Sequence, residues 1–226
     1  MARVIRVLLV DDDALVRAGL RLMLASASDI DVVGEAGDGG EVEALVDRHR
    51  PDLVLMDIRM PGVDGLEATR LLRGRPDAPE IVMLTTFTTD GYVLRALRAG
   101  AAGFLLKHTR PERIIDAVRQ AAAGEPVMSS EALGQLIGAV TSRPEPTAAS
   151  GTPSAAEAAR GLRLLGPRER EVAVAVSHGR TNAEIAAALY MSVPTVKSHI
   201  SHILAKLDLN NRVQIALLVH RAGPAA

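Results

Sequence analysis

The chain has 226 residues, of which 48% are hydrophobic and 23% charged, enough for one or two globular domains with a sizeable core. Cysteine is absent, which excludes disulfides, thiolate metal sites and cysteine nucleophiles. The apolar runs fall short of the ~20 residues of a membrane span, and the opening Met1-Ala2-Arg3 has no signal-peptide pattern. We therefore expect a cytoplasmic protein with no membrane partner.

Charge is distributed unevenly along the chain. From Gly161 onward, eight Lys and Arg residues face four Asp and Glu residues, which gives a net charge of +4. Because the whole chain carries −1, residues 1–160 carry −5. A basic C-terminal part favours an anionic partner, although a charge of +4 over 66 residues is not extreme.

Residues 4–123 alternate between short apolar runs and helical patterns. The apolar runs, bounded by turn residues, predict five strands at Val4–Val10, Val32–Ala36, Leu53–Asp57, Glu80–Thr85 and Gly103–Lys107. Helical patterns follow each strand, the first after Asp13 and the others at Glu41–His49, Leu66–Arg73, Tyr92–Ala99 and Pro111–Ala123. This order predicts an α/β fold built on a five-stranded, doubly wound (flavodoxin-like) parallel sheet.

The composition changes after Gly124-Glu125-Pro126. Ser129–Val140 has the pattern of one further helix, and residues 143–161 are rich in Pro, Ala, Ser and Gly without periodicity, as is typical of a flexible linker. We therefore expect a first domain over residues 1–126, a helix and linker over 127–161, and a second domain over 162–226.

Leu165–Leu218 predicts an all-α domain of four short helices. Pro167 suits the first position of one helix, Thr181 begins a capping-box pattern, and Ser192 caps a third helix. That third helix has an apolar stripe formed by Val196, Ile200, Ile203, Leu204 and Leu207. The last helix, Arg212–Arg221, is apolar on more than one face, so one face needs a cover such as a second copy of itself.

Polar side chains follow four of the predicted strands. Asp11 and Asp12 come after the first strand, Asp57 ends the third, Thr85 ends the fourth, and Lys107 ends the fifth. Parallel strands end at one edge of a sheet, so these side chains should converge there. A cation such as Mg²⁺ relieves the repulsion between close carboxylates, and Lys and Thr suit phosphate oxygens. The pattern predicts that Asp57 accepts a phosphoryl group, although each residue taken alone is also typical of a loop or a structural contact.

The outer face of the third C-terminal helix is small, polar or basic and has no acid. Its residues are Lys197, Ser198, Ser201, His202 and Ala205. Such a face predicts a helix that lies in the major groove of double-stranded DNA. Lys197 suits guanine, Ser198 and Ser201 suit bases or phosphates, and His199 and Lys206 suit backbone phosphates. An ordinary solvated helix face is the alternative, which the absence of acids disfavours.

Residues 3–124 resemble the receiver domain of two-component response regulators. The motifs that carry the resemblance are Asp11-Asp12, Asp57, Met60–Gly65, Thr85 and Gly100–Lys107. The resemblance implies that a sensor histidine kinase phosphorylates Asp57. It also implies a Mg²⁺ cofactor held by Asp12, Asp57 and the backbone carbonyl of Arg59, with Asp11 contacting it through water.

The same resemblance implies a switch built from three residues. Lys107 would pair with the phosphoryl group, and Thr85 would move toward it. Phe104 would turn inward with that movement.

The C-terminal part resembles the LuxR-type helix-turn-helix. The matching segments are Arg168–Val172, Thr181–Ala186, Thr195–Ile200, Ile203–Leu207 and Arg212. The resemblance adds Thr195 to the DNA-binding set, and it implies dimerisation through a last helix that carries Val213, Ile215, Leu217 and Leu218. Both parts together resemble the NarL/FixJ-type response regulators. That implies a transcription factor, not an enzyme, in which phosphorylation switches dimerisation and binding to an inverted-repeat promoter.

Two other interpretations remain open from the sequence. Asp11-Asp12-Asp13 contains the D-x-D pattern of aspartate-nucleophile phosphohydrolases, in which Asp11 and not Asp57 would be labelled. Such an enzyme has no use for the C-terminal helices, and the chain lacks insertions that would cap a substrate pocket. In the other interpretation the first domain is a passive dimeriser, against which the full set of acids argues.

Overall fold

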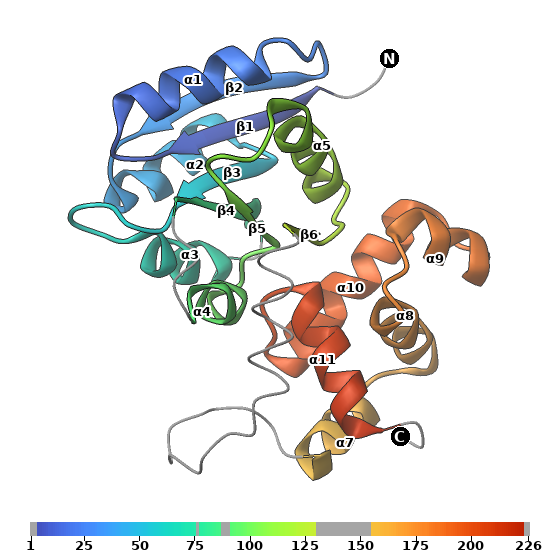
Figure 1. Ribbon diagram of the computed structural model, residues 1–226. Helices are drawn as coiled ribbons and strands as arrows, with labels where there is room; N and C mark the ends of the chain where they lie inside the picture. The colour runs from blue at the N-terminus through green and yellow to red at the C-terminus, as the bar shows by residue number, and fades with distance from the viewer. Residues whose placement is uncertain (1–3, 76, 87–90, 130–154, 224–226) are drawn as a thin grey trace. The chain divides into compact units, whose positions relative to one another are not determined.

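The chain folds into two compact units, Met1–Ala139 and Val140–Ala226 (Figure 1). The computed structural model describes residues 4–75, 77–86, 91–129 and 155–223. Within these ranges, no helix is both long and apolar enough to cross a bilayer. Each unit is built around its own apolar core.

The N-terminal unit contains a parallel sheet with the strand order β2-β1-β3-β4-β5-β6. Its strands are β1 (Ile5–Val10), β2 (Ile30–Ala36), β3 (Leu53–Asp57), β4 (Glu80–Thr85), β5 (Gly103–Leu106) and β6 (Val127–Met128). The five predicted strands are confirmed. The structure adds β6, which extends the sheet beyond β5 where the sequence predicted the start of a helix and linker. A two-residue strand is too short to show an alternating pattern.

Helices cover both faces of this sheet. They are α1 (Ala14–Leu24), α2 (Val42–His49, preceded by the 3-10 turn η1 at Gly39–Glu41), α3 (Gly65–Arg73), α4 (Tyr92–Ala99) and α5 (Pro111–Ala122). Helices α1 and α5 pack together, and α3 packs against both α2 and α4 (Figure 1). The doubly wound α/β arrangement is confirmed.

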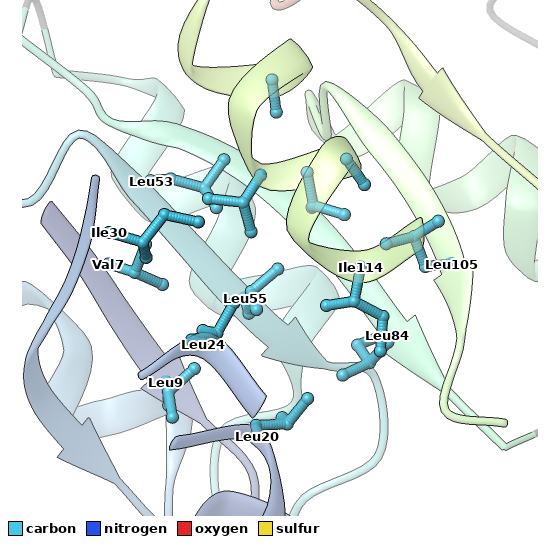
Figure 2. Close-up of a cluster of buried hydrophobic side chains, with 14 of the residues drawn as sticks. Val7, Leu9, Leu20, Leu24, Ile30, Leu53, Leu55, Leu84, Leu105 and Ile114 are labelled. Atoms are coloured by element: carbon cyan, nitrogen blue, oxygen red, sulfur yellow. The ribbon is translucent and has the colours of Figure 1, made fainter. Parts of the chain in front are cut away.

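Apolar side chains fill both sides of the sheet. Leu9 of β1 and Leu55 of β3 meet Leu20, Leu24 and Ile114 from α1 and α5 in one buried cluster (Figure 2). Successive strand residues point to opposite faces. The intervening residues are equally buried and therefore face the other layer: Leu8, Val54, Met56 and Met83. Burial on both faces explains why these strands are near-continuous apolar runs.

The C-terminal unit is all-α, as predicted. Its helices are α7 (Ala155–Arg163), α8 (Pro167–Ser177), α9 (Asn182–Leu189), α10 (Val193–Leu207) and α11 (Arg212–Ala222). The structure adds α7 to the four predicted helices; it begins inside the expected linker and ends two residues beyond it. Ala158 and Leu162 of α7 are buried in the core, and α7 packs against α11. The predicted helix Ser129–Val140 lies outside the described residues, except for Ser129.

The predicted helix caps of this unit are present. The Thr181 Oγ1 accepts a hydrogen bond of 3.2 Å from the backbone N–H of Glu184, and Glu184 Oε2 accepts one of 2.8 Å from the backbone N–H of Thr181. The Ser192 Oγ accepts a hydrogen bond of 3.2 Å from the backbone N–H of Thr195. These caps define where α9 and α10 begin, and the Ser192 cap ends the short turn between the two helices.

Candidate functional site

Four strand ends bring polar side chains together at one edge of the sheet. Asp11 follows β1, Asp57 ends β3, Thr85 ends β4, and Lys107 follows β5. Lys107 Nζ lies 2.6 Å from Asp11 Oδ2 and 3.0 Å from Asp57 Oδ2. Asp11, Thr85 and Asp57 are buried, with 1%, 3% and 6% of their surfaces exposed, whereas Asp12 is exposed. The convergence expected from the strand order is therefore found.

Burial and charge act in opposite directions at this site. Burial raises the pKa of the Asp57 carboxyl above its ordinary value, the hydrogen bond from Lys107 offsets part of that rise, and the Asp11 charge adds to it. Burial by itself would lower the pKa of the Lys107 ammonium, but Asp11 and Asp57 bring it above its ordinary value. The site thus holds two buried carboxylates around one ammonium.

The donor set fits a hard divalent cation. Asp11, Asp12 and Asp57 each offer one carboxylate oxygen, and these oxygens lie within 4.8 Å of one another. The buried Oδ2 of Asp11 accepts no hydrogen bond from the described residues, although the Lys107 ammonium is in ionic contact with it. Carboxylate oxygens are the ligands that Mg²⁺ takes from proteins. The Arg59 side chain makes another contact, with its guanidinium 5.6 Å from the ring centroid of Tyr92.

The turn after Asp57 is held by close backbone packing. The backbone N–H of Gly65 donates a hydrogen bond of 3.0 Å to the carbonyl of Ile58, and a side chain at Gly65 would overlap the carbonyl oxygen of Asp57. Gly62 has a φ of +73°, in the region that favours glycine. Asp64 then caps α3 by accepting a hydrogen bond of 2.8 Å from Glu67 N–H. These residues give Asp57 a fixed backbone position.

The turn between β1 and α1 contains two contacts that the sequence analysis missed. Asp13 caps α1 through a hydrogen bond of 2.8 Å from Leu15 N–H. Arg17 Nη1 donates a hydrogen bond of 2.5 Å to the backbone carbonyl of Asp11. An Asp immediately before an apolar helical pattern is a cap signal, so the first contact was readable from the sequence. The second depends on the path of the turn, which no local pattern shows.

Thr85 and Phe104 lie on neighbouring strands. Met83 pairs with Phe104, and Thr85 pairs with Leu106, in the parallel register of β4 and β5. Paired residues of parallel strands point to the same face, and every second residue along a strand does so too. Thr85 and Phe104 therefore share one face of the sheet, where Phe104 is 1% exposed.

The predicted DNA-reading face of α10 is on the surface. Thr195, Lys197, Ser198 and Ser201 are exposed, and His199 is partly exposed. On the inner side, Val196 and Ile203 are fully buried, and Ile200, Leu204 and Leu207 pack against the same core. The separation of an apolar inner face from a polar outer face matches the expectation.

Lys206 has a partner that the sequence analysis did not anticipate. Its Nζ donates hydrogen bonds to both carboxylate oxygens of Glu169, at 2.8 and 2.7 Å. Glu169 Oε2 also accepts a hydrogen bond of 2.8 Å from Gly166 N–H at the start of α8. The Lys206 ammonium therefore joins α10 to α8, while 48% of its side chain stays exposed, and its role as a phosphate contact stays a prediction.

Two residues of the expected dimer helix face inward. Ile215 is 0% and Leu218 is 7% exposed, and both belong to the core of the C-terminal unit. Val213 and Leu217 are partly exposed and lie four residues apart, which is one helical turn. The expectation is corrected accordingly: an outward apolar face of α11 consists of Val213 and Leu217, because the opposite side of the helix closes the core.

Comparison with known proteins agrees with both halves of this description. Residues 7–119 match the response regulator receiver domain, and residues 163–219 match the luxR family of bacterial regulatory proteins. The chain is 38% identical over 215 residues to the nitrate/nitrite response regulator protein NarL of Escherichia coli (strain K12). The match covers 95% of this chain and 94% of that protein. The chain belongs to the NarL-type response regulators.

A second relative and a solved structure support the same family assignment for this response regulator. It is 39% identical over 217 residues to the transcriptional regulatory protein LiaR of Bacillus subtilis (strain 168). That match covers 96% of this chain and 97% of that protein. Among solved structures, the response regulator ChrA of a heme-sensing two-component system is 34% identical, with a TM-score of 0.53 and coverage of 98% of both chains. The response regulator thus combines a receiver domain with a LuxR-type DNA-binding domain and is a transcriptional regulator.

Proposed function

We propose that Asp57 accepts a phosphoryl group from a sensor histidine kinase and that this modification switches dimerisation and promoter binding. The observation that carries the proposal is the contact of one partly buried ammonium, on Lys107, with both Asp11 and Asp57. An anionic phosphoryl group on Asp57 would meet a positive charge already in place. We assign a receiver domain that takes in residues 1–126 and β6, and a DNA-binding domain that takes in α7 and residues 162–226, and we expect them in the cytoplasm.

Each residue of the site has its own role in phosphoryl transfer. A carboxylate oxygen of Asp57 attacks the phosphorus of the phosphohistidine, and the bond from phosphorus to the histidine nitrogen breaks. Lys107 neutralises charge on the transferred group. Asp11, Asp12, Asp57 and the carbonyl of Arg59 would hold Mg²⁺, which, when bound, neutralises charge on the phosphoryl oxygens. Because the Asp11 carboxylate is already against Lys107, it keeps that ammonium oriented.

Thr85 and Phe104 act in the second step, in which the modification changes the conformation of the receiver domain. The Thr85 hydroxyl can donate to a phosphoryl oxygen at the adjacent strand end. Phe104 shares that face of the sheet, so a shift of β4 requires the ring to repack. Packed cores have discrete arrangements, which turns a small displacement into a two-state change.

On DNA, the exposed face of α10 carries the proposed contacts. Lys197 reads a base edge, while Thr195, Ser198, His199 and Ser201 contact bases or phosphates. Val213 and Leu217 of α11 pair with the same residues of a second copy. The resulting two-fold axis calls for an inverted-repeat site on double-stranded DNA.

The test compares wild type with Asp57→Ala and Asp11→Asn, each incubated with acetyl phosphate and Mg²⁺. Intact mass and peptide mapping follow the phosphoryl group, and a gel-shift titration follows DNA binding. We expect a label on Asp57, tighter DNA binding after labelling, and loss of both effects in Asp57→Ala. A label on Asp11 would overturn the proposal and favour the phosphohydrolase interpretation. Labelling that leaves DNA binding unchanged would contradict the switch.

A further inference from the structure

We propose that Arg17 is a positioning residue for the acidic site: its guanidinium ties the turn that carries Asp11 and Asp12 to Glu35 of β2, and so holds the carboxylates in the arrangement that a divalent cation needs. The inference rests on the proposed function of the Asp57 site. It assigns a role to a side chain that touches neither the phosphoryl group nor the cation.

The guanidinium of Arg17 makes contacts in two directions. Nη1 donates a hydrogen bond of 2.5 Å to the backbone carbonyl of Asp11, and Nε donates one of 3.2 Å to Glu35 Oε2. The Arg17 side chain is only 18% exposed, so both contacts are shielded from solvent on most sides. A planar guanidinium presents its donors at fixed angles, which lets one side chain fix two groups at once.

The β1–α1 turn has a physical need for such a contact. It contains three consecutive carboxylates, Asp11 to Asp13, whose mutual repulsion favours a more open turn. The guanidinium supplies positive charge at the backbone oxygen of Asp11 and leaves the carboxylate oxygens to other partners. The backbone N–H of Asp11 also donates a hydrogen bond of 3.1 Å to the carbonyl of Ala36, the last residue of β2. Asp11 is thus tied to β2 at two backbone groups: its N–H directly, and its carbonyl through Arg17 and Glu35.

Arg21 is a matched control provided by the chain itself. One turn further along α1, its Nε donates a hydrogen bond of 2.6 Å to Glu35 Oε1, and its side chain is 50% exposed. Arg21 and Arg17 both hold the pKa of the Glu35 carboxyl below its ordinary value, Arg21 more strongly. Of these two arginines, only Arg17 also bonds the backbone carbonyl of Asp11 among the contacts of the described residues. Both arginines bond Glu35, but they differ in the hydrogen bond to the Asp11 carbonyl, which Arg17 alone of the two makes.

The test measures Mg²⁺ binding without a phosphodonor, by calorimetric titration of the full chain. We expect Arg17→Ala and Arg17→Lys to raise the Kd for Mg²⁺ about tenfold, the lower end of what loss of an outer supporting contact does to metal sites. A Lys ammonium lacks the planar set of donors with which the guanidinium holds the Asp11 carbonyl and Glu35 together. Glu35→Gln should raise the Kd by a smaller factor, because Arg17 keeps its bond to the turn. Arg21→Ala should change the Kd less than about twofold.

A kinetic measurement separates positioning from general loss of structure. With acetyl phosphate as donor, the Arg17 variants should need more Mg²⁺ for half-maximal labelling of Asp57 but approach the wild-type rate at saturating Mg²⁺. Circular dichroism at each condition checks that the variants are folded, and Arg17→Lys decides the question if Arg17→Ala unfolds. Wild-type Mg²⁺ affinity in a folded Arg17 variant, or equal weakening in Arg21→Ala, would overturn the inference. Failure of Asp57 labelling in wild type would instead count against the proposed function, because the calorimetric titration does not depend on labelling.

Discussion

Glu169 holds the C-terminal unit together at two points. Its carboxylate accepts hydrogen bonds from Lys206 of α10 and from the backbone N–H of Gly166, where α8 begins. Only 10% of the side chain is exposed. The Lys206 hydrogen bond, and then the Gly166 hydrogen bond, lower the pKa of the carboxyl below its ordinary value of 4.5. This charged contact thus adds to the apolar packing that holds α10, the helix with the DNA face, against α8.

This contact predicts a pH dependence of stability. A depressed folded-state pKa means that the contribution of Glu169 is present above the unfolded value of 4.5 and is lost as the pH falls through the folded-state value. We expect Glu169→Gln to lower the free energy of unfolding of the C-terminal unit by about 1 kcal/mol near neutral pH, since it removes charge-assisted bonds. The variant should also show a weaker loss of stability below pH 4.5 than wild type.

Urea unfolding followed by circular dichroism across this pH range measures both effects. Glu171→Gln is the matched control, because Glu171 lies on the same helix and pairs only with the exposed Arg168 among the contacts of the described residues. Equal losses in the two variants would mean that the contacts of Glu169 contribute no more than a surface ion pair does.

At the scale of the element, α10 carries two lysines with different surroundings. Lys197 is on the exposed outer face, whereas the ammonium of Lys206 bonds Glu169. We expect Lys197→Ala to weaken DNA binding by about 1–3 kcal/mol and to reduce the steepness of its salt dependence by about one released ion. Lys206→Ala should mainly lower the stability of the C-terminal unit.

Fluorescence anisotropy with labelled operator DNA, repeated over a series of salt concentrations, gives both the affinity and the salt slope. Thermal unfolding of the same two variants gives the stability. A larger drop in salt slope for Lys206→Ala than for Lys197→Ala would reverse the assignment and place the C-terminal end of α10 on the phosphates.

At the scale of the whole molecule, the proposed dimer depends on a small apolar face. Val213 and Leu217 are the apolar residues of α11 that stay partly exposed and do not pack against the core that contains Ile215 and Leu218. We expect Leu217→Glu to leave the fold intact and to reduce binding to an inverted repeat at least tenfold, because two carboxylates would meet across the two-fold axis. Binding to a half-site should change little.

Sedimentation of the phosphorylated protein, with and without the inverted repeat, measures this association. His220→Glu is the control, since it adds a carboxylate to the same helix at an exposed position. A Leu217→Glu protein that still forms the two-to-one complex with wild-type affinity would exclude α11 as the interface.

The sequence by itself determined the order of strands and helices in the receiver domain, the candidate Asp57 and the helix-turn-helix. These features have local signals. Strands buried on both faces are apolar runs, parallel strands end at one edge, and helix caps have fixed spacings. The same signals failed for β6, which is too short, and for α7, because the Pro-, Ala-, Ser- and Gly-rich composition of residues 143–161 indicated a linker.

Only the tertiary structure decided which long-range partners meet. It placed Lys107 against both Asp11 and Asp57, gave Lys206 to Glu169, and brought Arg17 to the carbonyl of Asp11. It also turned Ile215 and Leu218 inward. A helix that is apolar on several sides does not reveal from its sequence which side is buried. Nor does a long charged side chain reveal its partner, because that depends on where the folded backbone brings residues that are far apart in the chain.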